Sequence, residues 1–276
     1  MEPPREPNHH MKTYIVDSFT DTPFHGNPAG VCLVEEQLTD DFMLSIAREL
    51  GLSETAFIER QHKPDVYLIR YFSPKMEIRL CGHATLASAK VLFTTHNLDV
   101  VRFFNRDNLE LVTSRSGGDV KMEFPVYDTR PATVPAAMLA ALGVDTVENV
   151  VYNEETKILL LEIRNPTTLA DLDPDFTALV ASHNSINGVL VTAPSQEGEF
   201  DFHSRYFWPW SGTDEDPATG GTHTFLTPYW STRLGKTKMK SFQSSRRTGQ
   251  MVVELIYNKL FITGPAVIVF EGELKG

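Results

Sequence analysis

Short hydrophobic runs dominate the chain and predict strands, with a few segments of helical spacing between them. The first half predicts strands in KTYIVDSF, AGVCLVE, TAFIER, VYLIRYFS, LELVTSR and VKMEFPV. In TDDFMLSIARELGL the apolar residues recur at helical spacing, with Thr39 as the expected N-cap and Gly51 as the expected stop. CGHATLASAKVLFTTH is apolar on nearly every side, which is typical of a helix buried inside a sheet.

The pattern restarts near residue 128. DTRPATVPAAMLAALG contains a helical patch, and NGVLVTAP and DFHSRYFWPW predict strands. TGGTHTFLTPYWSTRLGK predicts a second glycine-led helix, which Pro228 is expected to break or kink. GQMVVELIYNKLFITGPAVIVFEGEL ends the chain as strands joined by turns. Residues 1–10, MEPPREPNHH, show neither pattern and are expected to form a disordered lead-in.

The two halves of the chain share a weak repeat. RYFSP, which begins at Arg70, recurs as RYFWP, which begins at Arg205, and a glycine-led helix start follows each copy. We interpret this order as an internal duplication of about 135 residues. Alignment of the two helix starts pairs Cys81 with Thr219, Gly82 with Gly220 and His83 with Gly221.

Paired helix starts of this kind suit an anionic ligand. A helix N-terminus exposes unpaired N–H groups and a partial positive charge, and glycine lets a ligand approach the backbone closely. If the two halves face each other, Gly82 and Gly220 direct two such termini into one cleft. The simplest ligand for that cleft is a small carboxylate. The alternative is that the glycines only serve tight turns.

Composition narrows the class of protein. The chain has 276 residues, 41% of them hydrophobic and 22% charged, which fits one large domain or two smaller ones. A net charge of −11 argues against a nucleic-acid or anionic-lipid surface. Two cysteines make no disulfide framework and favour a reducing, cytoplasmic compartment. No apolar run has the length of a membrane span, and because MEPPREPNHH has no apolar core we expect no signal peptide.

Three segments carry candidate chemistry. Glu54, in LSETAFIE, has apolar neighbours, and partial burial would raise its pKa toward the range of a general base. GTDEDPATGG places Asp216 just before the second glycine-led helix, and His83 lies at the start of the first. Each of these residues, taken alone, is also compatible with a surface or capping role. The nine histidines show no metal-site spacing such as HExxH, so we expect no metal, and GxGxxG, GxxxxGK[ST] and GxSxG are absent.

Four motifs in order carry a resemblance to a known family: FHGNPAGVCLVE, IARELGLSETAFI, RYFSPKMEIRLCGHATLASAKVLF and DEDPATGGTHTFLTPYW. From Met11 onward the chain resembles the PhzF family of phenazine-biosynthesis-like isomerases, and DFHSRYFWPWSGTDEDPATGG resembles the animal phenazine biosynthesis-like domain-containing proteins. The resemblance implies an α+β, diaminopimelate epimerase-like fold of two pseudo-symmetric halves, each a β-sheet wrapped round a central helix. The expected halves are residues 11–127 plus 262–276 and residues 128–261, with the active site in the cleft between them.

The resemblance also implies site residues, a homodimer and no cofactor. In the phenazine enzyme a glutamate moves a proton within dihydro-hydroxyanthranilate, and Glu54 matches it, with His83 and Asp216 as the other catalytic positions. The matching substrate-binding positions are Ser53, Asn27, Gly82, Gly220, Gly221 and Thr222. The family usually has GSA after the threonine, whereas this chain has Gly220, Gly221 and Thr222. Thr222 can supply the missing hydroxyl one position later.

Racemases of the same fold offer an alternative chemistry. They use two cysteines, one from each half, but here Cys81 is paired with Thr219, whose hydroxyl is far too weakly acidic to replace a thiol. Cys81 is then expected to be a small apolar lining residue. We therefore expect a cofactor-independent isomerase that shifts a proton within a small carboxylate. Two alternatives stay open: an epimerase that opposes Glu54 with Asp216 or Cys81, and a non-enzymatic metabolite- or protein-binding protein that retains the cleft.

Overall fold

The computed structural model describes residues 10–196 and 198–275. The chain divides into two compact units: unit 1, Met1–Glu123 with Gly264–Gly276, and unit 2, Phe124–Thr263. The lead-in expected at residues 1–10 lies outside the described residues except for His10. That residue is not lead-in, because it begins the first strand and pairs with Lys275.

Unit 1 is built from strands around one long buried helix. Its elements are β1 (His10–Ser18), β2 (Asn27–Val34), α1 (Asp40–Leu50), β3 (Glu54–Arg60), β4 (Val66–Phe72), β5 (Glu77–Ile78), α2 (Gly82–Thr95), β6 (Val100–Phe104), β7 (Glu110–Ser116), β8 (Asp119–Pro125) and β18 (Ala266–Lys275). Strand β8 ends just inside unit 2.

The first helix forms as its sequence predicts. Thr39 precedes α1, and its side-chain oxygen accepts a hydrogen bond from the N–H of Phe42 at 3.2 Å. Gly51 ends the helix in the left-handed conformation, with φ at 64°, which glycine adopts without strain. The helix packs its apolar side against β3 and β4. Glu54 follows three residues later as the first residue of β3.

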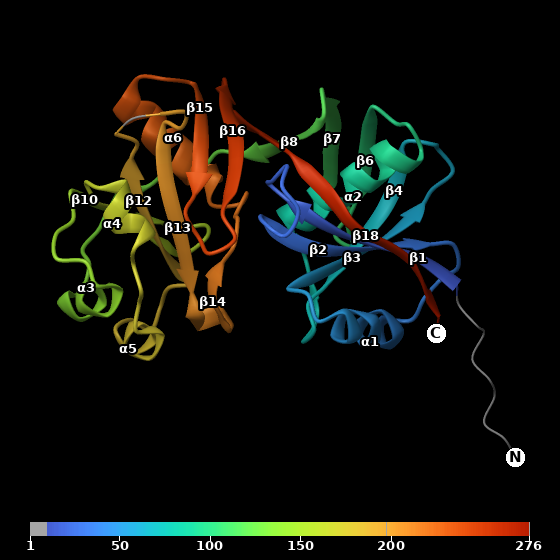
Figure 1. Cartoon of the computed structure of the whole chain (residues 1–276), viewed down its shortest axis with the longest axis horizontal. Coiled ribbons are helices and arrows are strands. Elements are labelled where there is room, and N and C mark those ends of the chain that lie inside the picture. Colours follow the sequence, from blue (N-terminus) through green and yellow to red (C-terminus); the bar gives the residue numbers. More distant parts are fainter. Residues whose placement is uncertain (1–9, 197, 276) are drawn as a thin grey trace, which may run out of the picture. The chain divides into compact units, whose positions relative to one another are not determined.

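Helix α2 is the centre of unit 1. Ten of its fourteen residues are buried, and it packs against β1, β2, β3 and β18, which surround it in Figure 1. The buried, nearly all-apolar helix expected in CGHATLASAKVLFTTH is therefore confirmed. Its first turn is anchored to β1, because the hydroxyl of Ser18 donates to the carbonyl oxygen of His83 at 2.8 Å. The position of the residues around His83 is thus fixed by the core.

Unit 2 has the same kind of construction. Its elements are β9 (Arg130–Pro131), α3 (Ala136–Leu142), β10 (Asn149–Asn153), β11 (Ile158–Glu162), α4 (Pro166–Ala170), α5 (Phe176–Ala181), β12 (Gly188–Pro194), β13 (Phe202–Trp208), the 3₁₀ helix η1 (Pro209–Ser211), β14 (Thr213–Asp216), α6 (His223–Leu234), β15 (Lys238–Gln243), β16 (Gly249–Ile256) and β17 (Lys259–Gly264).

Strand pairing repeats between the two units. In unit 1, β2 runs parallel to β3, β3 antiparallel to β4, and β4 parallel to β6. In unit 2, β11, β12, β13 and β15 repeat these three pairings in the same order. Helix α2 precedes β6, and α6 precedes β15. This shared topology agrees with an internal duplication.

The repeat extends to single side chains. Arg70 on β4 donates two parallel hydrogen bonds to Glu77, at 2.7 and 2.8 Å, and Arg205 on β13 does the same to Glu215, at 2.7 and 2.9 Å. Each guanidinium also lies over the phenylalanine ring two residues further along its strand. Arg70 and Arg205 are therefore equivalent positions of the repeat. This equivalence fixes how the sequence of unit 1 aligns with that of unit 2.

Pro228 does not break α6, so of the two expected outcomes, a break or a kink, the break is wrong. The helix runs from His223 to Leu234 with the proline inside it. Proline has no N–H, so the carbonyl oxygen of Thr224 loses its normal helical donor. The backbone N–H of Tyr127 donates to that oxygen instead, at 2.9 Å. A donor from outside the helix thus compensates for the proline. Helix α6 also begins at His223, after the two glycines rather than at them.

The buried arginine fork of unit 2 gives a stability prediction. Arg205 is 8% exposed, and besides Glu215 its Nη1 donates to the carbonyl oxygens of Leu169, Ala170 and Leu172 around the end of α4. We expect Arg205→Met to lower the free energy of unfolding by about 3 kcal/mol, because it leaves the largely buried carboxylate of Glu215 without its partner and removes a donor from three carbonyls.

The matched control is Arg130→Met, since Arg130 also pairs with a glutamate and stacks on an aromatic ring, but its side chain is 63% exposed. We expect that change to cost about 1 kcal/mol or less. Urea denaturation of both variants provides the measurement. Equal losses would contradict the importance of the buried fork.

Candidate functional site

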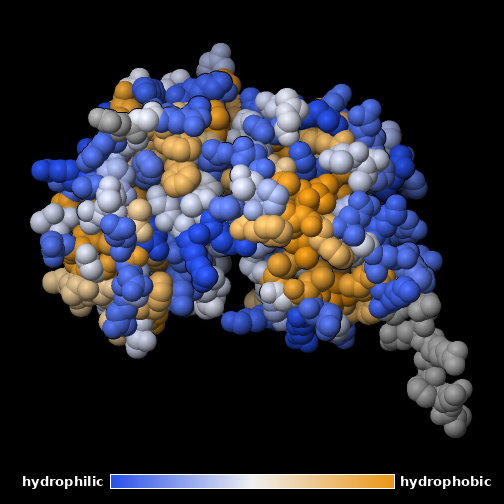
Figure 2. Space-filling view, in the orientation of Figure 1, coloured by the Kyte–Doolittle hydropathy of each residue, from blue (hydrophilic) through white to orange (hydrophobic). Residues whose placement is uncertain are grey.

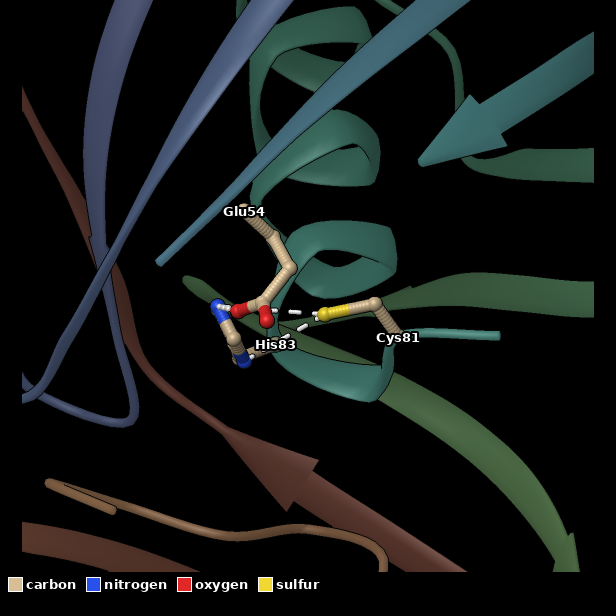
Figure 3. Close-up of side chains that lie close together, drawn as sticks. All are labelled: Glu54, Cys81 and His83. Atoms are coloured by element: carbon tan, nitrogen blue, oxygen red, sulfur yellow. Dashed lines mark hydrogen bonds and ion pairs between the residues drawn. The ribbon is translucent and has the colours of Figure 1, made fainter. Parts of the chain in front are cut away.

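Three side chains meet at the start of α2. Glu54 comes from the first residue of β3, Cys81 precedes α2, and His83 is the second residue of that helix. Figure 3 shows their side chains pointing toward one another. The structure therefore brings together two of the three predicted catalytic residues, Glu54 and His83, with Cys81, which the sequence analysis expected as a lining residue and, in the epimerase alternative, as a partner of Glu54.

His83 lies between the carboxylate and the thiol. Its Nε2 is 3.2 Å from Oε2 of Glu54, and the Sγ of Cys81 is 3.4 Å from its Nδ1. The side chains of His83 and Glu54 are 9% and 13% exposed. The pair is thus almost removed from water, while a small part of the Glu54 side chain remains accessible.

A tight turn supports this cluster from the side of β1 and β2. Gly26 has φ at 65°, and a Cβ on it would lie 2.2 Å from the carbonyl oxygen of Ser18, so no other residue fits there. Asn27 follows, fully buried, and pairs with Ser18 across the two strands. Because the hydroxyl of Ser18 holds the carbonyl of His83, the predicted binding residue Asn27 lies beside the anchor of the site.

The pKa of Glu54 differs from the expectation. Burial raises the pKa of this carboxyl, but the hydrogen bond and charge of His83 and a hydrogen bond from Ser53 outweigh burial and lower it overall. The expected upward shift is therefore wrong, because the sequence showed the apolar neighbours of Glu54 and not the imidazole that contacts it. Glu54 is a carboxylate at neutral pH.

The other two groups complete the charge arrangement. Burial acts to lower the pKa of His83, but Cys81 and Glu54 raise it well above its ordinary value. Burial raises the pKa of the Cys81 thiol. His83 acts on that thiol in the opposite direction and lowers its pKa. Glu54, whose own pKa is lowered, supplies a negative charge that faces the imidazole.

This cluster is also the place among the described residues where three metal-ligating side chains come together. The ligand atoms of Glu54, Cys81 and His83 lie within 4.8 Å of one another. A metal would require a thiolate and a neutral imidazole with a free nitrogen. Binding would therefore release the protons of Cys81 and His83 and replace the contact between Nε2 of His83 and Glu54. The arrangement is suited to moving protons.

The predicted residues of unit 2 form a separate hydrogen-bonded turn. Asp216 ends β14, and its carboxylate accepts a hydrogen bond from the hydroxyl of Thr219. The backbone N–H of Thr219 donates to Oε1 of Gln243 at 2.8 Å, and Nε2 of Gln243 donates to the carbonyl oxygen of Asp216 at 2.6 Å. Gly220, Gly221 and Thr222 follow and lead into α6. Gln243 was missed by the sequence analysis, since an isolated glutamine in a strand carries no signal.

The histidine that begins α6 contrasts with His83. His223 is fully buried, its Nδ1 is 3.0 Å from the carbonyl of Thr219, and its Nε2 is 2.9 Å from the hydroxyl of Ser241. Burial lowers its pKa to about 4, so it is neutral at physiological pH.

The predicted site residues are divided between the two units. Unit 1 holds Glu54, His83, Gly82, Ser53 and Asn27, and unit 2 holds Asp216, Gly220, Gly221 and Thr222. A single cleft shared by both groups stays a prediction.

Comparison with known proteins now identifies the family. The family model for PhzC–PhzF, phenazine biosynthesis-like protein, matches residues 16–272, nearly the whole chain. The chain belongs to the PhzC–PhzF family. Phenazine biosynthesis-like domain-containing protein 2 of Mus musculus is 40% identical, with 96% of this chain and 99% of the relative covered. An uncharacterized isomerase of Pseudomonas aeruginosa is 41% identical, with 96% and 98% covered.

Solved structures confirm the fold class. A PhzF-family protein from Enterococcus faecalis, 34% identical, superposes with a TM-score of 0.90 over 96% of this chain and 99% of its own. A probable proline racemase from Agrobacterium radiobacter, 11% identical, reaches 0.61 over 96% and 92% and shows a shared fold alone. PhzC–PhzF members thus have the α+β fold that also occurs in racemases, and relatives bearing the name isomerase support an isomerase-type enzyme.

The charge arrangement of the PhzC–PhzF cluster leads to a titration prediction. We expect the imidazole of His83 to titrate well above 6.5, and we expect Glu54→Gln to lower that pKa, because the change removes the negative charge that favours the imidazolium while burial remains. NMR of protein labelled with ¹⁵N-histidine measures both, with neutral His223 as a reference in the same spectra. A wild-type His83 that titrates at or below 6.5 would show that the two side chains do not form an ion pair.

Proposed function

We propose that this PhzC–PhzF protein is a cofactor-independent isomerase that shifts a proton within a small carboxylate, with Glu54 as the general acid and base. The observation that carries the proposal is the 3.2 Å ion pair between Glu54 and His83, which keeps an ionised carboxylate in a nearly buried position. A carboxylate with few water contacts and one exposed edge is placed to take a proton from a bound molecule.

The proposed cycle uses one base twice. Glu54 accepts a proton from an activated C–H bond, and the electron pair of that bond moves into the conjugated system of the substrate. The resulting carboxylic acid no longer compensates the charge of His83, which makes it a stronger acid. Glu54 then returns the proton to a different carbon, the double bond has migrated, and the carboxylate is restored. Neither oxidant nor reductant is consumed.

The thiols argue against a two-cysteine racemase. The chain has two cysteines, and Cys32 lies in the hydrophobic core between α1 and the sheet, together with Met43, Ile46 and Phe57. Burial raises the pKa of Cys32 to about 12. Cys81 therefore has no second reactive thiol to work with. An epimerase with Glu54 opposed by Asp216 is the second candidate, because the shared fold includes racemases.

The remaining features complete the proposal. We propose that the carboxylate substrate is bound by Gly82, Gly220, Gly221 and Thr222, with Ser53 and Asn27.

We also propose a homodimer and a cytoplasmic location. Hydrophobic side chains gather on the visible face of unit 1, over β18 and its neighbours, which supports association (Figure 2); sedimentation at micromolar concentration checks it. In the part of the chain described, no helix is long and apolar enough to cross a membrane.

Replacement of Glu54 by glutamine removes the proposed base. Glu54→Gln should retain the fold and lower the rate of proton transfer by about 10²–10⁴-fold, since an amide accepts no proton at neutral pH. The assay incubates the protein in D₂O with dihydro-hydroxyanthranilate and with the carboxylates of a cell extract, and mass spectrometry finds the compound that gains deuterium.

The matched control is Glu59→Gln on the same strand, which should leave exchange unchanged. Wild-type exchange with double-bond migration supports the isomerase, and exchange with inversion supports the epimerase. Neither deuterium exchange nor double-bond migration in any carboxylate supports the binding protein, since a base that returns the same proton can shift a double bond without exchange. A fully active Glu54→Gln would exclude Glu54 as the base.

Replacement of Cys81 tests the role of its thiol. Cys81→Ser should keep activity within about tenfold of wild type, because Glu54 carries the proton and a neutral hydroxyl replaces a neutral thiol. The same exchange assay, with folding checked by thermal melting, gives the measurement. A folded but inactive Cys81→Ser would instead favour the epimerase in which Cys81 opposes Glu54.

A further inference from the structure

The register of the repeat identifies a pair of equivalent buried amides. In unit 2, Gln243 on β15 lies opposite Ser204, the residue before Arg205. In unit 1, Phe104 on β6 lies opposite Leu68, so the next residue, Asn105, corresponds to the one before Arg70. Because Arg70 and Arg205 are equivalent, Asn105 and Gln243 occupy the same position of the repeat.

Both amides hold the main chain just ahead of a central helix. Asn105 is 6% exposed, and its Nδ2 donates to the carbonyl oxygen of Arg79 at 2.9 Å, two residues before Cys81. Gln243 is 1% exposed, and its Nε2 donates to the carbonyl oxygen of Asp216 at 2.6 Å, ahead of α6. The two acceptors differ by one position in the repeat, since Arg79 lies two residues after the fork glutamate Glu77 and Asp216 lies one residue after Glu215. Equivalent amides thus hold neighbouring positions of the same segment.

Gln243 makes more hydrogen bonds to the segment ahead of its helix than Asn105 does. Besides the bond to Asp216, its Oε1 accepts the backbone N–H of Thr219 at 2.8 Å, and its Nε2 lies 3.3 Å from the hydroxyl of Thr219. That hydroxyl donates to the carboxylate of Asp216. The orientation of the carboxylate is therefore connected to Gln243 through one threonine. The carbonyl of Pro217 is held separately by Ser245.

We propose that Asn105 and Gln243 are positioning residues, which fix the segments that carry Cys81 and His83 in unit 1 and Asp216 in unit 2. The catalytic part of this inference rests on the proposed isomerase and on the catalytic position of Asp216 that the family resemblance implies. Loss of Gln243 frees the turn between Asp216 and α6 and leaves the buried N–H of Thr219 without its acceptor. A carboxylate released in this way is misplaced for chemistry even though the fold persists.

The test compares two isosteric changes within unit 2. Gln243→Met keeps the volume of the side chain and removes all of its hydrogen bonds. Asn153→Leu is the control: Asn153 is 1% exposed, its Nδ2 donates to the carbonyl of Asp128 at 2.8 Å, and its Oδ1 accepts the N–H of Thr156 at 2.9 Å. Both variants lose a buried amide clamp, but Asn153 is not bonded to the Asp216 segment.

Two measurements are made on the full-length protein. For Gln243→Met we expect amide hydrogen exchange at Thr219, followed by NMR, to become about tenfold faster. We expect kcat in the deuterium-exchange assay to fall about 10²-fold with KM nearly unchanged, because the loss concerns orientation in the transition state. Asn153→Leu should lower the melting temperature to a similar extent and change neither value.

Each outcome decides the inference. Unchanged protection of Thr219, or a kcat no lower than that of the control, overturns it. If Gln243→Met does not fold, Thr219→Val replaces it, since that change removes the hydroxyl that connects Gln243 to the carboxylate of Asp216 while conserving shape, and a fall in kcat is again expected. Asp216→Asn separates the two proposals: full activity there refutes the catalytic role of Asp216, and the Thr219 exchange rate then decides alone whether Gln243 holds the segment.

Discussion

The ion pair between Glu54 and His83 constrains the whole of unit 1. A buried carboxylate or a buried imidazolium alone would lose its charge, and the contact at 3.2 Å favours the charged form of each, with help from Ser53 for Glu54 and from Cys81 for His83. The two residues come from β3 and α2, so the pair requires the strand and the first turn of the helix to be held in place. Gly26, the Ser18 hydroxyl and the all-apolar body of α2 supply that rigidity. The same contact sets the ionisation of both groups.

One topology serves two different purposes in this chain. Both units repeat the strand order and the arginine–glutamate fork, yet only unit 1 places a charged acid–base pair at the start of its central helix. The corresponding region of unit 2 holds a hydroxyl-bonded aspartate and a neutral histidine. The duplicated scaffold has therefore diverged at its helix starts, where substitutions alter chemistry. It has kept the arginine–glutamate fork, where substitutions would alter stability.

The sequence revealed the local features and missed the distant ones. The cap Thr39, the stop Gly51 and the buried helix α2 follow from spacing and residue type, and the structure confirms them. Strand β11, Ile158–Glu162, was not foreseen, because a short continuous apolar run is compatible with either a buried strand or a buried helix. The site shows the same division. Glu54 and His83 were found by motif, but the lowered pKa of Glu54 and the role of Gln243 depend on contacts between segments far apart in the sequence.

The bond between Tyr127 and Thr224 bears on where the chain can be divided. It supplies the donor that Pro228 withholds in the middle of α6, and it comes from the first residues of unit 2. A fragment that starts at Asp128, the boundary suggested by the sequence, lacks this donor and leaves a buried carbonyl unsatisfied inside its central helix. A fragment that starts at Phe124 keeps it. The peptide between the units is thus an integral part of the second one, and its removal would be equivalent to damaging a core helix.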